Sequence, residues 1–366
     1  MNAWSTAPLT GTLHMFVAWD WGEEVQLDAA RRLLPAEPQT LPRRPRTPPS
    51  VAYSPPPLLF PLTPLRLDLP VLGQVAAVAK LAVFDFGGAS LSLEIPLTAT
   101  PPQLLEIARA LADSRGLVAT ARTAVEPTFQ TLQPAIEHPN WSPLAEEYLV
   151  FEIQPASCPL SVEELLRDQS QWLAQLTRLE SATLCAAEVG LITQSRLCYT
   201  PGDLFLPEWP AALLLDTDCE ETLQTIEFAN LQLLEYRSLD QLLDARLAEA
   251  YRSIHPLTRW RWPFLRTHDQ PLRVLGELRV TAHTLFERTG NAFKLMGDQY
   301  LARVYRLLAE RFHLGEWSHS IQQSLDTVES AYQVVSDQAA VYRIELLEII
   351  VIVLIFIEIV LTLVGH

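Results

Sequence analysis

Two pairs of acidic side chains in this sequence could take part in acid–base or metal chemistry. Asp85 and Glu94 would face each other across a hairpin expected over 75–97, and paired carboxylates can divide acid and base roles. Asp240 and Asp244 stand one helical turn apart, and carboxylates are ligands for hard cations. Charged residues of this kind are more typical of solvent-facing surfaces, so we interpret both pairs as surface residues.

Signatures of nucleophilic, phosphate and metal chemistry do not occur in the sequence. It contains no P-loop, no GxGxxG after a strand, no GxSxG and no HExxH. The eight histidines do not cluster with cysteines or carboxylates at ligand spacing, and no CxxC pair occurs. We therefore predict no catalytic residue, no metal and no cofactor. We interpret the cysteines as reduced core thiols of a cytosolic protein, although their number alone would allow a disulfide: Cys158, Cys185, Cys198 and Cys219.

The composition describes a folded, acidic protein. Hydrophobic residues make up 49% and charged residues 19% of 366 residues, which leaves room for two modest domains. The formal net charge is −16, from 43 acidic and 27 basic side chains. Because such a field repels phosphate backbones, we expect no direct nucleic-acid binding.

The first 215 residues alternate strand-like and helix-like stretches, which favours an α+β class. We assign 1–70 to a strand–helix segment with a Pro-rich linker, and 71–215 to an α+β domain. The clearest element is the hairpin over 75–97, with clean alternation on both sides of Gly87 and Gly88. The other expected strands are 12–19, 147–154, 196–200 and 211–215, and the expected helices are 23–34, 101–115, 161–176 and 181–189.

A helical domain over 216–345 follows, and it is expected to contain a long antiparallel hairpin. Helices over 271–312 and 317–345 would be joined by a turn, with Gly315 suited to a helix C-cap. The second helix carries apolar residues at alternating steps of four and three, the spacing of a coiled-coil seam. The same seam could join two copies of the chain, so a homo-oligomer stays open. The seam residues are Ile321, Leu325, Val328, Tyr332, Val335 and Tyr342.

The last apolar run predicts a single transmembrane helix over 346–364. A bilayer core of roughly 30 Å needs about 20 helical residues, which this run nearly matches. Arg343 just before it agrees with the positive-inside rule, so we expect a tail-anchored protein in a lipid bilayer with its soluble part in the cytoplasm. The alternative is a buried core helix.

Two groups of residues near this run could contact a membrane. Glu348 and Glu358 lie opposite the seam; Glu358 would either specify a partner within the membrane or reach the far interface. Trp260 and Trp262 alternate with arginines in a segment suited to lipid headgroups. The alternatives for that segment are an ordinary loop with inward aromatics and an RNA-binding patch.

Three stretches of the sequence resemble one known family. Residues 226–247, residues 291–338 (NAFKLMGDQYLARVYRLLAERF and onward) and the apolar tail resemble the "required for meiotic nuclear division" family, domain of unknown function 155. The phrase AVFDFGG at 82–88 is similar to an early strand of that family. The resemblance implies a membrane-anchored protein without established catalytic activity, whose mitochondrial member holds ribosomes near the inner membrane. Without a transit peptide, a bacterial member in a plasma membrane is expected.

Two functional hypotheses follow from these features. The first is a non-catalytic, membrane-tethered scaffold whose protein partner belongs to the translation machinery. The second is an enzyme or small-molecule sensor with a site in the α+β part. A cleft of polar side chains around Asp85 would favour the second hypothesis, and a flat or apolar surface would favour the first.

Overall fold

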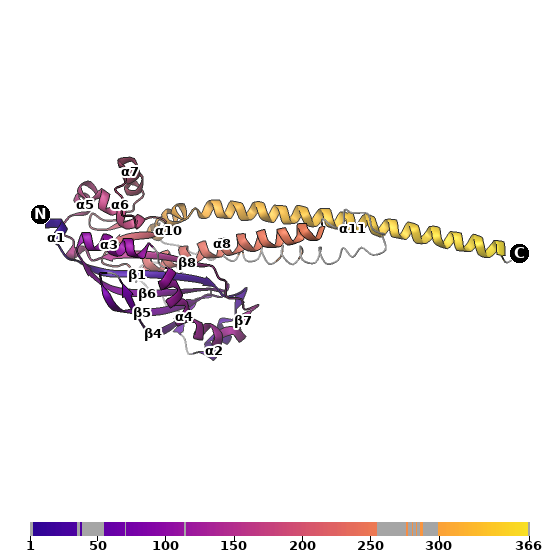
Figure 1. Ribbon diagram of the computed structural model, residues 1–366, viewed down its shortest axis with the longest axis horizontal. Helices are drawn as coiled ribbons and strands as arrows, with labels where there is room; N and C mark the ends of the chain where they lie inside the picture. The colour runs from indigo at the N-terminus through magenta and orange to yellow at the C-terminus, as the bar shows by residue number, and fades with distance from the viewer. Residues whose placement is uncertain are drawn as a thin grey trace. The chain divides into compact units, whose positions relative to one another are not determined.

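A mixed eight-stranded sheet forms the centre of the N-terminal part (Figure 1). The computed structural model describes residues 3–34, 37–38, 55–69, 71–112, 115–254 and 299–364, together with five positions between 276 and 287. In these residues the strand order is β3-β4-β5-β6-β1-β8-β10-β9, and a separate ladder pairs β2 with β7. The strands are β1 (Leu9–Asp20), β2 (Glu24–Val25), β3 (Glu37–Pro38), β4 (Leu58–Leu69), β5 (Gly73–Val83), β6 (Gly88–Ala99), β7 (Ile136–Glu137), β8 (Ala145–Ile153), β9 (Leu204–Pro207) and β10 (Ala211–Leu215).

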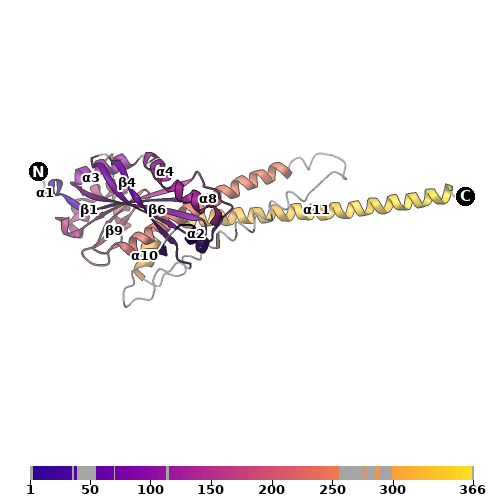
Figure 2. The same ribbon diagram turned by 90° about the horizontal axis from the view of Figure 1, so that it is seen from below.

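Helices cover both faces of this sheet. On one face, side chains of α3, α4 and α6 join the odd-numbered residues of β1, such as Leu13 and Val17, in the main core. On the other face, Ala18 of β1 packs with Leu231 and Leu234 of α8. Figure 2 shows α3 and α4 beside the strands. The helices are α1 (Ala3–Thr6), α2 (Leu27–Leu33), α3 (Pro101–Leu111), α4 (Arg115–Leu132), α5 (Val162–Asp168), α6 (Ser170–Arg178), α7 (Ala186–Gln194), α8 (Glu220–Ile254), α10 (Gln299–Arg311) and α11 (Leu314–Val364).

The predicted α+β class is wrong, because the sheet contains a parallel pair with a helical crossover. β5 and β6 do form the expected antiparallel hairpin. However, β8 and β10 run parallel, and the chain between them passes through α5, α6 and α7. Parallel strands need such a crossover connection. With helices on both faces of a mixed sheet, the N-terminal part is α/β.

The chain divides into two compact units. The α/β unit comprises Met1–Ser238 and Arg288–Glu316, and the helical unit comprises Leu239–Glu287 and Trp317–His366. α8 contributes its first 19 residues, 220–238, to the α/β unit and its remaining residues to the helical unit.

The turn before α11 differs from the predicted one. α10 ends at Arg311, and His313 adopts the left-handed conformation with φ 51°, which commonly ends helices. Gly315 lies inside α11, so the predicted C-cap at this glycine is wrong. Most of the expected first hairpin helix, 271–298, lies outside the described residues, apart from five positions.

The predicted transmembrane helix over 346–364 is contradicted. Nowhere in the described part of the chain is a helix both long and apolar enough to span a membrane. The expected tail anchor and single-pass plasma-membrane location are corrected together with this helix.

Candidate functional site

A cavity of about 150 Å³ lies in the α/β unit between the sheet and α8, and we call it the α8 cavity. Strand register places its sheet residues side by side: His14 pairs with Glu94, and Ser92 pairs with both Phe16 and Lys80. Because α8 contributes positions 220, 223, 224 and 227, the helix side of the cavity is a single helix face. The lining residues are His14, Phe16, Leu59, Lys80, Ala82, Ser92, Glu94, Glu220, Leu223, Gln224 and Glu227.

The basic side chains of the α8 cavity, His14 and Lys80, are paired with carboxylates. Nε2 of the buried His14 lies 2.6 Å from Oε2 of Glu152, which comes from the neighbouring strand β8. The ammonium of Lys80 donates to Oε1 of Glu94 at 2.6 Å. Both carboxylates hold their partners in place from the sheet itself, so these donors have fixed directions.

The acceptors on α8 are less well matched. Glu227 is 8% exposed, and burial raises the pKa of its carboxyl group to about 7, with Glu94 adding to the rise while Ser90 and Lys80 oppose it. Among the described residues, Oε1 of Gln224 is buried without a hydrogen-bond partner. A buried acceptor without a donor is costly, so this side of the cavity suits a hydrogen-bond donor.

Two further carboxyl groups, the half-buried Asp20 and the buried Glu235, lie farther along the same sheet face. Burial raises the pKa of Asp20 to about 6, although its Oδ1 accepts a hydrogen bond from the Gly22 amide at 3.0 Å. Burial and the nearby charge of Asp20 raise the pKa of Glu235 well above its ordinary range. Like charges in a dry site disfavour double ionisation, so this pair favours a protonated carboxyl group.

The sequence AVFDFGG at 82–88 forms the turn between β5 and β6. Phe84 and Phe86 pack with Leu231 and Leu234 of α8. Gly87 has φ 98°, and a Cβ there would lie 1.8 Å from the Gly22 carbonyl oxygen. This motif is therefore structural, since its aromatic residues hold α8 and its glycine permits a close backbone approach.

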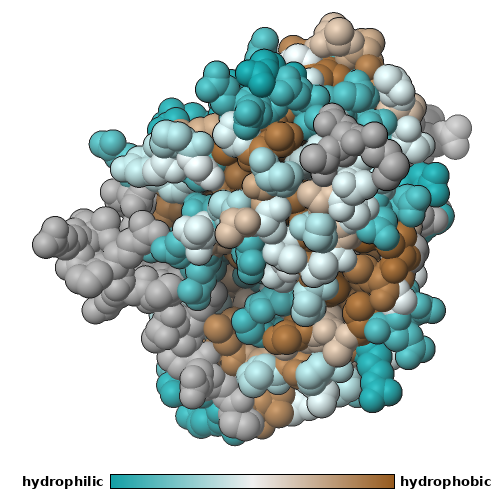
Figure 3. Space-filling model, turned by 90° about the vertical axis from the view of Figure 1, so that its left-hand side faces the viewer, coloured by the Kyte–Doolittle hydropathy of each residue, from teal (hydrophilic) through white to brown (hydrophobic). Residues whose placement is uncertain are grey.

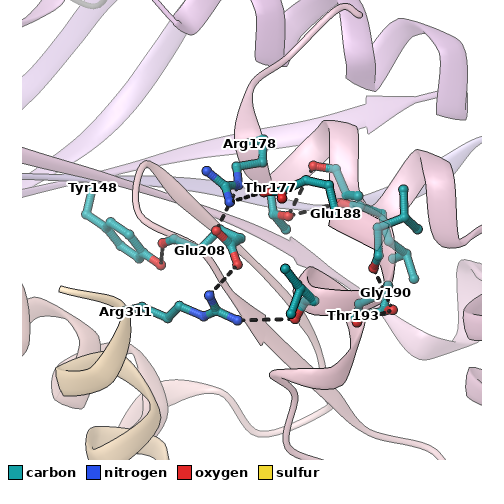
Figure 4. A network of polar contacts seen from close by, with 12 residues as sticks. Tyr148, Thr177, Arg178, Glu188, Gly190, Thr193, Glu208 and Arg311 are labelled. Atoms are coloured by element: carbon teal, nitrogen blue, oxygen red, sulfur yellow. Dashed lines mark hydrogen bonds and ion pairs between the residues drawn. The ribbon is translucent and has the colours of Figure 1, made fainter. Parts of the chain in front are cut away.

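A second polar network joins β9, β10, α6, α7 and α10 around the buried Glu208 (Figure 4). Its carboxylate contacts Arg178 Nε at 3.0 Å and Arg311 Nη1 at 3.2 Å, and Arg178 also contacts Glu188 at 2.6 Å. The hydroxyl of Tyr148 donates to the Glu208 carbonyl at 2.8 Å. Burial raises the pKa of Glu208 in spite of both guanidinium groups. We interpret this network as a structural tie for α10.

The four cysteines differ in exposure, and burial raises the pKa of three of them, Cys158, Cys198 and Cys219. All four are free, as expected, but Cys185 and Cys198 are exposed, so the prediction that all are core thiols is wrong. Burial raises the pKa of the Cys219 thiol, and nearby Glu152 adds to this rise. A thiol with a raised pKa carries little reactive thiolate.

The carboxylate pairs predicted from spacing do not form as expected. Asp85 lies in the turn between β5 and β6, while Glu94 pairs in register with Val78, so the two do not face each other. Asp240 accepts a hydrogen bond from Ser320 at 3.2 Å, and Asp244 is exposed. Over the described ranges, no group of three His, Cys, Asp or Glu residues could hold a metal ion.

The seam residues predicted on α11 belong to the helical unit. Ile321 and Val328 of α11 are buried, and Leu325 and Tyr332 are half-buried. Glu348 and Glu358 are exposed. The predictions for Trp260 and Trp262, and for the side chains of Val335, Tyr342 and Arg343, fall outside the described residues.

The comparison with protein families covers the part of the chain that forms the sheet. The family model described as "Uncharacterized protein MJ0711, N-terminal domain" matches residues 10–221, more than half of the 366 residues. The chain belongs to this family. No curated protein and no solved structure matches the chain. The family region includes all sheet residues of the α8 cavity and ends before Gln224 and Glu227.

Sequence reasoning missed the α8 cavity. His14, Lys80 and Glu94 are far apart in the chain, and only the register of β1, β5 and β6 brings them together. One signal was available in the sequence: Gln224 and Glu227 are polar residues on the helix face that also carries Leu223.

Proposed function

We propose that this chain is a non-catalytic scaffold whose α/β unit senses a small polar molecule in the α8 cavity. The observation that supports it best is a cavity between sheet and helix with paired basic side chains and, among the described residues, an unmatched buried acceptor, Gln224 Oε1. Ligand sites commonly combine apolar walls with a few convergent polar groups. An apolar cavity of about 150 Å³ can hold benzene, so a ligand of roughly six to ten heavy atoms fits here.

The course of α8 supports a sensor rather than a storage site. Its first two turns line the cavity, and the same continuous helix supplies residues 239–254 of the helical unit. A ligand that binds one position of α8 more tightly than another would shift that helix. The proposed output of the sensor is therefore carried by α8 into the helical unit.

The state of the potential catalytic groups supports binding over catalysis. His14 is held by Glu152, and burial raises the pKa of the Cys219 thiol. A thiol nucleophile needs a depressed pKa, which Cys219 does not have. The Nε2 atom of His14 already has a protein partner and is not available to a ligand.

A ligand screen with a cavity-filling variant tests this function. Ala82, 2% exposed, lines the cavity, so Ala82→Leu should fill part of its volume. The exposed Ala119 on α4 offers a matched control, Ala119→Leu. We expect ligand-observed NMR on the full chain to find binders in a panel of small amines, carboxylates and alcohols. Their binding should be lost in Ala82→Leu and kept in Ala119→Leu; a panel without any binder would refute the function.

By resemblance to the "required for meiotic nuclear division" family, of which this chain would be a bacterial member, we propose the translation machinery as the protein partner. The α/β unit exposes large apolar side chains at Leu191, Tyr199 and Trp209, with 59%, 73% and 42% exposure. Figure 3 shows hydrophobic patches between hydrophilic residues on one face. Exposed apolar patches often mark protein-binding surfaces.

Co-sedimentation with purified bacterial ribosomes tests this partner. The full chain should pellet with ribosomes, and Tyr199→Ser with Trp209→Ser should reduce the pelleted fraction. A chain that stays in the supernatant at every ribosome concentration would exclude a direct contact.

Self-association through α11 is a further proposal for the scaffold. Val334, Val341 and Ile344 of α11 are more than half exposed, at 56%, 52% and 59%. Sedimentation equilibrium of the full chain should give a mass above 41.1 kDa. A monomer over the whole concentration range would contradict it.

A further inference from the structure

The chemical class of the ligand follows from which groups in the α8 cavity already have partners; this inference rests on the proposed ligand site. Lys80 is the ammonium in the lining, and its Nζ donates to Glu94 at 2.6 Å. His14 Nε2 is held by Glu152 at the same distance. The strong donors of the cavity are thus directed at protein carboxylates and leave little for an anionic ligand to accept.

The hydrogen-bond acceptors on the α8 side of the cavity are not paired in this way. Gln224 Oε1 is buried and has no hydrogen-bond partner within the described residues. Glu227, three positions along α8, is 8% exposed and has the Ser90 hydroxyl beside it. Side chains three apart on a helix are neighbours, so an amide oxygen and a carboxyl group converge on the same small volume.

The balance of charge in the lining agrees with this pattern. Lys80 donates to Glu94, and Glu152 lies behind His14, so the acidic side chains of the lining outnumber the basic ones, with Glu220 and Glu227 on the α8 side. A cation entering such a site gains charge-assisted hydrogen bonds, whereas an anion faces two carboxylates. Apolar surface remains for the rest of the ligand on Phe16, Leu59, Ala82 and Leu223.

We propose that the α8 cavity binds a small organic cation whose primary or secondary ammonium group donates to Gln224 Oε1 and to the Glu227 carboxylate. Its hydrocarbon part lies against the apolar wall formed by Phe16, Leu59 and Leu223. The size of the cavity restricts the hydrocarbon part of the ligand to a short chain or a single ring.

Three probes with one carbon skeleton test the class of ligand: n-butylammonium, n-butanol and n-butyrate. We expect titration calorimetry of the full chain at pH 8 to rank the ammonium at least tenfold tighter than butanol, with no binding of butyrate. Glu227→Gln should weaken the binding of butylammonium at least tenfold, and Glu106→Gln, at an exposed position of α3, should leave its affinity unchanged. Gln224→Glu adds a carboxylate and should make butylammonium bind more tightly, so the test remains valid if Glu227→Gln fails to fold.

The outcomes separate this inference from the proposed function. If butanol or butyrate binds more tightly than butylammonium, and Ala82→Leu abolishes that binding, the proposal of an ammonium ligand is overturned and the sensor function stands. Equal affinity of the ammonium for the wild type and the Glu227→Gln and Gln224→Glu variants would also overturn it. If none of the three probes binds, and the wider panel yields no binder either, the cavity holds water only and both proposals fail.

Discussion

Glu227 is a buried carboxyl group, and proteins rarely bury carboxyl groups. It is 8% exposed, faces Lys80, Glu94 and His14 of the sheet in the α8 cavity, and its pKa rises to about 7. A carboxyl group held there is protonated on folding over part of the accessible pH range, which links ligand binding, pH and stability through one residue.

The raised pKa of Glu227 predicts a pH-dependent effect of Glu227→Gln on stability. The folded pKa is about 7 and the unfolded value is 4.5, so the folded state is favoured by protonation. The stability from this group is complete below pH 4.5 and is lost as the pH rises through 7. Glu227→Gln should therefore raise the free energy of unfolding at pH 8, by up to about 3 kcal/mol, and much less at pH 5. Chemical denaturation at both values measures this, and an equal effect at both would contradict it.

Gly88 at the start of β6 leaves little room for a side chain. A Cβ there would lie 2.8 Å from Cε2 of Phe86, 2.9 Å from Cδ1 of Leu231 and 3.1 Å from Oε1 of Glu235. Gly88→Ala should lower the free energy of unfolding by about 1–3 kcal/mol, because α8 or the turn must shift. Gly116→Ala in α4, where nothing lies within 4 Å, serves as control and should stabilise by about 0.5–1 kcal/mol. Equal effects of both substitutions in thermal denaturation would refute the crowding at Gly88.

The elements around the sheet are tied together by contacts distant in the sequence. α10 is joined to β9 and β10 through Arg311 and Glu208, and α8 is joined to the β5–β6 turn through Phe84 and Phe86. These ties decide which helix covers which face, and therefore where the α8 cavity forms.

Arg311→Met should loosen α10. The substitution leaves the buried Glu208 with Arg178 alone, so we expect a loss of about 1–3 kcal/mol in the free energy of unfolding. Arg303→Met, at an exposed position on the same helix, is the matched control and should change little. Urea denaturation compares the two, and a loss shared by both variants would assign the effect to the helix surface instead of the network.

The sequence indicates single elements well and their arrangement poorly. The hairpin of β5 and β6 was predictable because its residues alternate and a Gly-Gly turn joins its strands. That Asp85 and Glu94 do not face each other was not predictable. An error of a few residues in the expected register is enough to move Asp85 from the strand into the turn. The parallel pairing of β8 with β10 leaves no local signal, because it depends on a crossover of about 60 residues.

The molecule as a whole consists of two units that share one helix. α8 begins at the cavity with Glu220 and continues to Ile254 in the helical unit. This continuity gives a sensor a covalent route to the helical unit, and it can be tested by weakening the helix without touching the cavity.

Two glycines in the second part of α8 should uncouple the units. In the wild type, n-butylammonium should slow amide hydrogen exchange both at 220–238 and at 239–254. Gln241→Gly with Ala245→Gly, both at exposed positions, weakens the helix by about 2 kcal/mol and should confine the slowing to 220–238. The substitution Ala119→Gly in α4 is the control. Unchanged exchange at 239–254 in the wild type would show that α8 transmits nothing.

The central claim is that the α8 cavity is a ligand site, and the side-chain amide of Gln224 reports on it most directly. Its oxygen is the buried acceptor without a partner among the described residues, so a bound ammonium must alter it. In ¹H–¹⁵N spectra of the full chain, titration with n-butylammonium should shift the Gln224 side-chain resonances in a saturable manner, and Ala82→Leu should abolish the shift. Resonances that stay in place up to saturating probe would contradict the claim.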